Sequence, residues 1–262
     1  MELHPYWKKQ DPAKPLYPDI EWNKPEQKSQ AGKLGIIGGN KLGFVAVGEA
    51  YSLALEAGVG DVRVLLPDVL RRTIPASITE AHFAPSNPSG GLSRDAIGDM
   101  SALAGWANGL LMIGDAGRNS ETAILYEEFV KQYQGHLTIT RDAFDLFRQT
   151  LETIVEREDT VLILSFAQLQ TLFKGVYYPK ILTFSMQLQQ LVEALHKFTI
   201  TYPVSIMTFH QGHIIVAHAG QITTTAWENP MAIWKGSVAA RAAAYCLWTP
   251  QKPLEAITTS LQ

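Results

Sequence analysis

The sequence predicts an α/β domain with a mainly parallel central sheet and helices on both of its faces. From residue 32 onward, short runs rich in apolar and β-branched residues alternate with helical patterns, which is the order found in crossover units of a parallel sheet. The chain has 262 residues, of which 46% are hydrophobic and 18% charged, so it can bury a core of useful size. We expect one domain over residues 32–262, without internal repeats or a linker.

The elements follow from these patterns. The clearest helix is 185–199, where apolar residues recur at helical spacing and form one stripe. Asn119 or Ser120 is expected to cap the helix that follows it. The last two strands are joined by the turn "HAGQ" and should form an antiparallel hairpin at one edge of the sheet. The expected strands are 34–37, 62–66, 110–113, 137–139, 161–164, 204–207, 213–217 and 222–225, and the other expected helices are 44–57, 93–106, 120–134 and 141–157.

Residues 1–31 form a separate N-terminal arm. Five prolines among many charged residues exclude a helix or a central strand here. A flexible tail is one interpretation, but the arm carries more large apolar residues than disordered tails usually do. We expect an ordered arm that lies over the globular body or over a neighbouring subunit. Those apolar residues are Tyr6, Trp7, Leu16, Tyr17, Ile20 and Trp22.

Composition narrows the classes of function. The net charge of −3 is too small to gather nucleic acid or an anionic membrane, so neither is expected as a partner. The sequence shows neither an apolar run long enough to cross a bilayer nor a secretory signal, and we expect a cytoplasmic protein. Cys246 is the only cysteine, which excludes an intrachain disulfide, and we expect a small buried residue rather than a nucleophile there.

Ligands of such sheets bind at the carboxyl ends of the strands, where two glycine turns are expected. In "GIIGGNKLGF" (35–44), Gly38 and Gly39 would let a backbone approach a ligand closely, with Asn40 beside them. The stretch is neither the dinucleotide fingerprint nor a P-loop, and a tight turn without a ligand remains an equal alternative. In "LLMIGDAGRNSET" (110–122), Gly114 lies in the turn after another expected strand, and Asp115 and Arg118 are polar residues at the carboxyl end of that strand. A turn whose Asp bonds its own backbone is an equal alternative to a ligand site.

Two further groups of polar residues can be explained without a ligand or a metal ion. Asp142, in "ITRDAF", follows another expected strand, and a helix N-cap accounts for it without a ligand. His210 and His213 should point to opposite faces, while His218 should fall in a turn. With no carboxylate spaced to complete their coordination, no metal site is expected.

The strongest site candidate is "ENPMAIWKGSVAARAAAYCLW" (228–248), a loop that leads into an Ala-rich helix. Ser237 should cap this helix, and the backbone N–H groups around Gly236 and Val238 would form an anion cradle. Asn229 precedes the cradle, and Lys235 adds positive charge to it. A serine without an adjacent base does not deprotonate a substrate, so the stretch predicts phosphate binding rather than proton transfer. The plain alternative is a closely packed core helix.

Together these stretches resemble the ribokinase-like ADP/ATP-dependent NAD(P)H-hydrate dehydratases, which also form the C-terminal domain of nicotinamide-nucleotide repair enzymes. The resemblance runs from about Gly32 to Trp248 and keeps the order and spacing of the motifs. It implies a ribokinase-like fold, ADP or ATP as cofactor with Mg²⁺, and hydrated NADH or NADPH as substrate. The matching stretches are "GIIGGNKLGFVAVGEAYSLALEAGVGDVRVLLP", "GLLMIGDAGRNSET", "TRDAFDLF" and "ENPMA".

The chain departs from the resembled pattern where its chemistry lies. The family's Gly-Thr-Gly-Asp loop, whose Asp is the base, becomes "IWKGSVAA", with Gly236 at its last glycine and Ser237 at the Asp. The His and Glu of another segment are replaced by Ser165 and Gln168. A lysine is missing from "FHQG", and of the family's Asp-Ala-Asp only Asp142 remains, because Thr140 replaces the first Asp. General base catalysis typically contributes about 10²–10⁴-fold, so these losses predict impaired catalysis.

Three interpretations follow. The leading one is a divergent, catalytically impaired homologue that retains a nucleotide or phosphate site lined by the residues above, with Ser237 and Asp142 at the catalytic positions. The second is an active dehydratase, a lyase of metabolite repair, whose base comes from Asp115 or Asp142. The third is a non-enzymatic scaffold, because Trp234 could fill the phosphate pocket. Family members are often oligomeric, and we expect a homo-oligomer.

Overall fold

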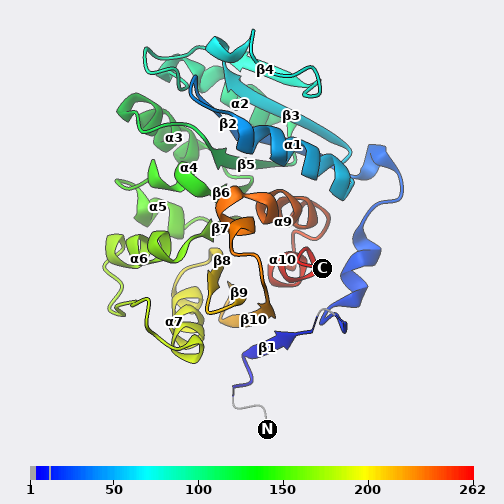
Figure 1. Ribbon diagram of the computed structural model, residues 1–262, viewed down its shortest axis with the longest axis vertical. Helices are drawn as coiled ribbons and strands as arrows, with labels where there is room; N and C mark the ends of the chain where they lie inside the picture. The colour runs from blue at the N-terminus through cyan, green and yellow to red at the C-terminus, as the bar shows by residue number, and fades with distance from the viewer. Residues whose placement is uncertain (1–3, 12) are drawn as a thin grey trace.

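The computed structural model describes residues 4–11 and 13–262, without the side chains of Ala232 and Trp234. Within them, ten strands form one sheet in the order β1-β10-β9-β8-β7-β6-β5-β2-β3-β4 (Figure 1). From β8 through β4 neighbouring strands are parallel, whereas β9 is antiparallel to both β8 and β10. This is the mainly parallel sheet with an antiparallel hairpin that the sequence predicts.

All eight expected strands are present, and two more occur at the sheet's edges. They are β2 (Lys33–Gly38), β3 (Asp61–Pro67), β5 (Gly109–Gly114), β6 (His136–Thr140), β7 (Thr160–Leu164), β8 (Ser205–His210), β9 (His213–His218) and β10 (Gln221–Ala226). The additional strands are β1 (Trp7–Gln10), which pairs in parallel with β10, and β4 (Ala81–Ala84), which pairs with β3. The β9–β10 hairpin is therefore next to the edge, with β1 outside it.

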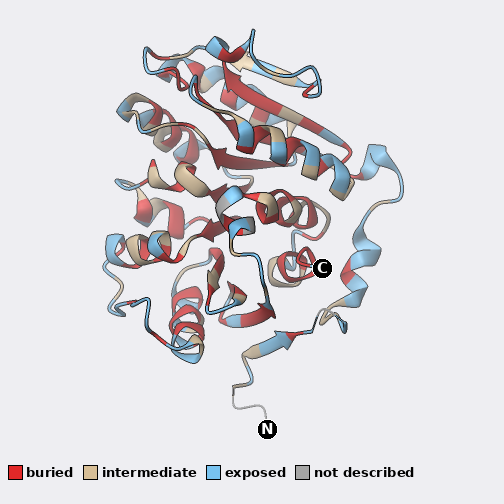
Figure 2. Ribbon diagram, viewed as in Figure 1, coloured by how far each residue is buried: buried red, intermediate tan, exposed pale blue. Residues whose placement is uncertain are grey.

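Helices cover both faces of the sheet and enclose two hydrophobic cores (Figure 1). One core lies under α1 (Val45–Ala57), α8 (Met231–Lys235), α9 (Ser237–Trp248) and α10 (Pro253–Thr259). The other lies under α2 (Ile97–Trp106), α3 (Ser120–Gln132), α4 (Arg141–Asp145), α5 (Leu151–Val155), α6 (Phe166–Gly175) and α7 (Leu188–Thr201). The strands between these layers are buried almost throughout, as Figure 2 shows. Asn119 caps α3 by accepting from the backbone N–H groups of Glu121 and Thr122, as predicted.

The expected helix 141–157 is wrong as a single element. It is split into α4 and α5, and residues 146–150 between them make tight turns. In these turns the N–H groups of Leu146 and Phe147 donate to carbonyls three residues earlier. Phe144, in α4, and Phe147, in the turns that follow, are both completely buried.

The N-terminal arm lies on its own chain. Trp7 Nε1 donates to Thr224 Oγ1 of β10 over 2.9 Å, and Gln10 Nε2 donates to the Thr258 carbonyl of α10 over 3.0 Å. Further along the arm, Tyr245 of α9 donates to Glu21. Figure 2 shows this segment running mostly exposed beside α9 and α10. Contact with a neighbouring subunit remains a prediction.

Two features of composition also have structural counterparts. Cys246 is buried in α9, and burial raises the pKa of its thiol to about 12, so it stays protonated near neutral pH. Within the described residues, every helix is too short or too polar to cross a lipid bilayer.

Candidate functional site

The two glycine turns at the carboxyl ends of β2 and β5 interlock. Gly39 N–H donates to the Gly114 carbonyl over 2.8 Å. A Cβ atom at Gly38 would lie 2.3 Å from that same carbonyl oxygen, closer than any side chain can approach. The expectation that these glycines open space for a ligand is thus corrected for Gly38, because what approaches it is the backbone of β5.

Asn40 ties the first glycine turn to the second. Its Nδ2 donates to the Asp115 carbonyl over 2.7 Å, and its Oδ1 accepts the Leu42 N–H over 2.6 Å. Asn40 is buried, with 8% of its surface exposed, so both bonds are shielded from water. Gly38, Gly39, Asn40, Gly114 and Asp115 therefore form one bonded unit at the sheet's rim.

Asp115, Arg141 and Asp142 are joined in the same unit. Asp115 Oδ1 accepts from Arg141 Nη2 over 2.8 Å, and its Oδ2 accepts the Ala46 N–H of the first turn of α1 over 2.8 Å. Asp115 N–H donates to Asp142 Oδ1 over 2.9 Å. Asp115 and Arg141 adopt left-handed backbone conformations, with φ of 52° and 55°. Such backbone conformations persist only where surrounding contacts determine them, and they cluster at functional sites.

Two predicted helix caps are wrong. Thr140, rather than Asp142, stands at the N-cap of α4, and Asp142 instead accepts from the second glycine turn. Gly236, rather than Ser237, stands at the N-cap of α9, with a left-handed φ of 82°. Ser237 is the first residue of the helix, and the sequence supplies no acidic residue in its first turn. In this first turn, Ala239 N–H donates to the Gly236 carbonyl over 3.0 Å.

Asn229 and Lys235 lie at the two ends of α8. Asn229 Oδ1 accepts the Met231 N–H over 3.1 Å, at the start of α8. Lys235 is exposed and lines a pocket of ≈ 600 Å³ together with Ser237 and residues of α1. Whether Trp234 fills a phosphate pocket lies outside the described residues, because its side chain is among those left out.

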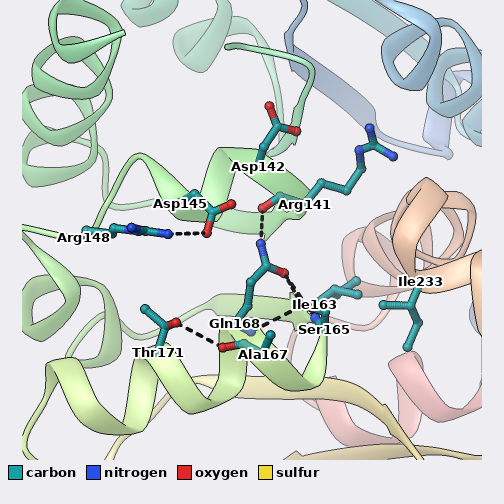
Figure 3. A pocket seen from close by; sticks show the side chains of 10 residues that line it. All are labelled: Arg141, Asp142, Asp145, Arg148, Ile163, Ser165, Ala167, Gln168, Thr171 and Ile233. Atoms are coloured by element: carbon teal, nitrogen blue, oxygen red, sulfur yellow. Dashed lines mark hydrogen bonds and ion pairs between the residues drawn. The ribbon is translucent and has the colours of Figure 1, made fainter. Parts of the chain in front are cut away.

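A second pocket, with a volume of ≈ 420 Å³, opens at the ends of β6 and β7 (Figure 3). Arg141 and Asp142 line one side, and in the close-up the Asp142 carboxylate points away from Gln168 and Ser165. The stem of Arg141 runs beside the entrance of α9, since a Cβ atom at Gly236 would lie 3.1 Å from Arg141 Cδ. The lining residues are Arg141, Asp142, Asp145, Arg148, Ile163, Ser165, Ala167, Gln168, Thr171 and Ile233.

Ser165 and Gln168 build the floor of this pocket. Ser165 is the N-cap of α6, and the two side chains form a capping box in which each accepts the other's backbone N–H. Gln168 Nε2 also donates to the Arg141 carbonyl over 2.7 Å. The two residues that replace the resembled family's His and Glu thus hold a helix start and the backbone of Arg141.

The remaining candidates do not line the pocket that Arg141 lines. Arg118 is exposed and lines a neighbouring pocket beside the start of α3, which shares Asp145 and Arg148 with the first. His210 and His213 are direct cross-strand partners, so the expectation of opposite faces is wrong, and His218 ends β9 rather than lying in the turn. His210 Nε2 bonds the Met186 carbonyl, and His218 Nδ1 bonds Ser205. Within the described residues, no group of three or more His, Cys, Asp or Glu side chains is arranged to hold a metal ion.

Arg141 is the site residue that sequence analysis missed. It stands next to Asp142, in a segment already singled out, but its role depends on a left-handed backbone that the sequence does not reveal. One signal was available: an arginine directly after a buried strand is placed at the rim where ligands bind.

Comparison with known proteins identifies the fold. No family model and no curated protein matches the sequence. Among solved structures, a ribokinase-like superfamily protein from Enterococcus faecalis superposes with a TM-score of 0.73 and 15% identity, covering 98% of this chain and 86% of its own. The fold is ribokinase-like.

Nucleotide complexes are among the structural neighbours of this ribokinase-like protein. The ADP/ATP-dependent NAD(P)H-hydrate dehydratase of Bacillus subtilis, co-crystallised with ATP and Mg²⁺, has a TM-score of 0.61 at 13% identity, covering 94% of this chain and 86% of its own. An ADP complex of Bacillus subtilis pyridoxal kinase reaches 0.52 at 12% identity, covering 88% of each chain. At such identities the similarity is one of fold, and the ligands belong to those proteins.

Proposed function

We propose that this chain is a catalytically impaired relative of the dehydratases that retains a nucleotide site, with ADP or ATP bound through its phosphates near the entrance of α9. The observation that carries the proposal is that the carboxylates of Asp115, Asp142 and Asp145 at this rim are each engaged in a bond or ion pair with the protein. Ser237 stands where the resemblance places the base. The fold's nucleotide-bound neighbours support the choice of ligand.

The residues near the entrance of α9 are better suited to binding a phosphate than to abstracting a proton from a substrate. The α9 entrance offers backbone N–H donors, and the adjacent pocket carries Arg141 together with the hydroxyl groups of Ser165 and Thr171. The pocket also carries the carboxylates of Asp142 and Asp145, but the first accepts the Asp115 N–H and the second pairs with Arg148. A general base needs a carboxylate or imidazole directed at the substrate. Mg²⁺ would arrive with the phosphates of the nucleotide, and hydrated NADH or NADPH is the substrate for any residual turnover.

The test combines binding with turnover. ADP and ATP, each with Mg²⁺, should raise the melting temperature, and adenosine should not; at a hundredfold excess over Kd the added stability is about 2.7 kcal/mol. Incubation with hydrated NADH and ATP should restore no more dihydronicotinamide absorbance than a sample without protein. Turnover that disappears in both Ser237→Ala and Asp142→Asn would overturn the impaired interpretation. The absence of any shift with either nucleotide would overturn the nucleotide site and favour the scaffold.

A further inference from the structure

One ion pair of the rim joins a residue that lines the pocket to a carboxylate bound at the start of α1. Arg141 lines the ≈ 420 Å³ pocket, while the Asp115 carboxylate is bound to Arg141 and to the first turn of α1. The two side chains are only 23% and 19% exposed. A charge pair in this environment is screened by water and salt far less than a surface pair.

Arg141 is the better placed of the pocket's two cations. Arg148 also lines the pocket, but its side chain is 63% exposed and its guanidinium lies 3.7 Å from Asp145. The backbone of Arg141 is fixed by the bond from Gln168 Nε2 to its carbonyl, and its stem lies against Gly236. The stem of Arg141 is therefore held beside the entrance of α9, and its guanidinium is bonded to Asp115.

We infer that Arg141 is the residue that recognises the anionic group of the ligand, and that Asp115 competes with the ligand for it. The inference rests on the proposed function, which supplies a phosphate as that group. A guanidinium binds phosphate and carboxylate oxygens in the same forked geometry, so a phosphate can replace the Asp115 carboxylate at Arg141. Asp115 keeps a second partner, the Ala46 N–H, when it yields the first.

This arrangement predicts opposite effects for the two halves of the pair. Removing the guanidinium takes away a ligand contact, whereas removing the Asp115 charge takes away a competitor. A purely structural ion pair would weaken binding in both cases, or in neither. Both positions have a left-handed backbone, which asparagine adopts more readily than most residues, so asparagine is the appropriate substitution at each.

The experiment measures Kd by calorimetry for ADP with Mg²⁺ and, separately, for inorganic pyrophosphate. We expect Arg141→Asn to weaken both ligands by about tenfold or more, as for a hydrogen bond to a charged group. Asp115→Asn should tighten them by about threefold. The double variant should bind like Arg141→Asn, because without the guanidinium there is nothing left to compete for. Arg94→Gln, which breaks an exposed pair with Glu128 elsewhere on the surface, is the matched control and should change neither Kd.

The outcomes separate this inference from the proposed function. Wild-type affinity for ADP in Arg141→Asn, or weaker binding in Asp115→Asn, overturns the inference and leaves the nucleotide site standing. If pyrophosphate binding depends on Arg141 but ADP does not bind, the proposed nucleotide site is wrong, and the inference that Arg141 recognises an anion stands. Binding of neither probe by the wild type overturns both. If Arg141→Asn does not fold, Arg141→Lys decides: it keeps the charge but loses the fork, and unchanged affinity in it contradicts recognition by the guanidinium.

Discussion

Two regions of the rim carry the same kinds of residue and use them differently. The inner turns, residues 38–43 and 114–117, contain Gly38 and Gly114, whose missing Cβ atoms would meet a carbonyl and a carboxylate of the protein itself. The outer turn, residues 229–237, contains Gly236, whose missing Cβ would lie nearest to side-chain carbons of Ile113 and Arg141. Glycine is therefore required at Gly38 and Gly114 by close packing against backbone or bonded polar atoms. At Gly236 the nearest atoms belong to side chains, which can shift more easily than the backbone.

The largest expected effect lies in the inner turns. Gly114→Ala places a Cβ 2.2 Å from Asp142 Oδ1 at a φ of 100°, so it combines backbone strain with a clash against a bonded carboxylate. We expect the free energy of unfolding to fall by about 3 kcal/mol, as measured by urea denaturation. A loss below about 1 kcal/mol would show that the inner turns have space to yield, and the contrast between the two regions would disappear.

Gly236→Ala tests the outer turn and should cost less. Its φ of 82° strains any other residue, but Ile113 Cδ1 at 2.9 Å and Arg141 Cδ at 3.1 Å can move aside. We expect a loss of about 1.5 kcal/mol in the free energy of unfolding, nearly all of it from the backbone. Gly212→Ala is the matched control, because its φ is 75° and nothing lies within 4 Å of its added Cβ. A loss in Gly236→Ala well above that of Gly212→Ala would mean that the outer turn is packed as rigidly as the inner ones.

The sequence predicts the buried part of this fold well and its edges poorly. The eight central strands have apolar runs because helices cover both faces of the sheet. Strands β1 and β4 lie at the two edges, and "WKKQ" and "AHFA" carry no such run. The split of 141–157 into α4 and α5 was likewise not predicted, because the apolar spacing of this stretch is compatible with one helix.

At the site, the sequence predicts which residues reach the rim but not what they contact there. Asp115 and Asp142 lie at strand ends as expected, yet neither bond of Asp115, to Ala46 or to Arg141, has a signature in the chain's spacing. Each partner comes from a different crossover unit, so the bonds exist only after the sheet has formed. Arg141 could not be predicted for the same reason, because its left-handed backbone is held by a bond from Gln168 in another crossover unit.

Asp142→Asn weakens the inner turns without adding an atom. The asparagine carbonyl can still accept the Asp115 N–H, but the bond loses the charge that makes such bonds roughly twice as strong. We expect the free energy of unfolding to fall by about 1 kcal/mol. The comparison variant is Asp145→Asn, three residues along the same pocket wall, which breaks only a 3.7 Å pair with an exposed arginine and should cost less than about 0.5 kcal/mol. Equal losses in the two variants would mean that the Asp142 bond adds nothing beyond surface electrostatics.

The smallest effect is expected at Gly43, in the same inner turns as Gly38. Its N–H donates to the Asn40 carbonyl, a bond that alanine keeps, and nothing lies within 4 Å of an added Cβ. Alanine also restricts the unfolded chain, which favours folding by about 0.4–1 kcal/mol where the native backbone accepts it. Gly43→Ala should therefore leave the free energy of unfolding unchanged or raise it slightly in the same urea titration. Gly43 has no close neighbour to displace. A loss comparable to that of Gly114→Ala would therefore mean that the inner turns need glycine for its backbone freedom rather than for close packing.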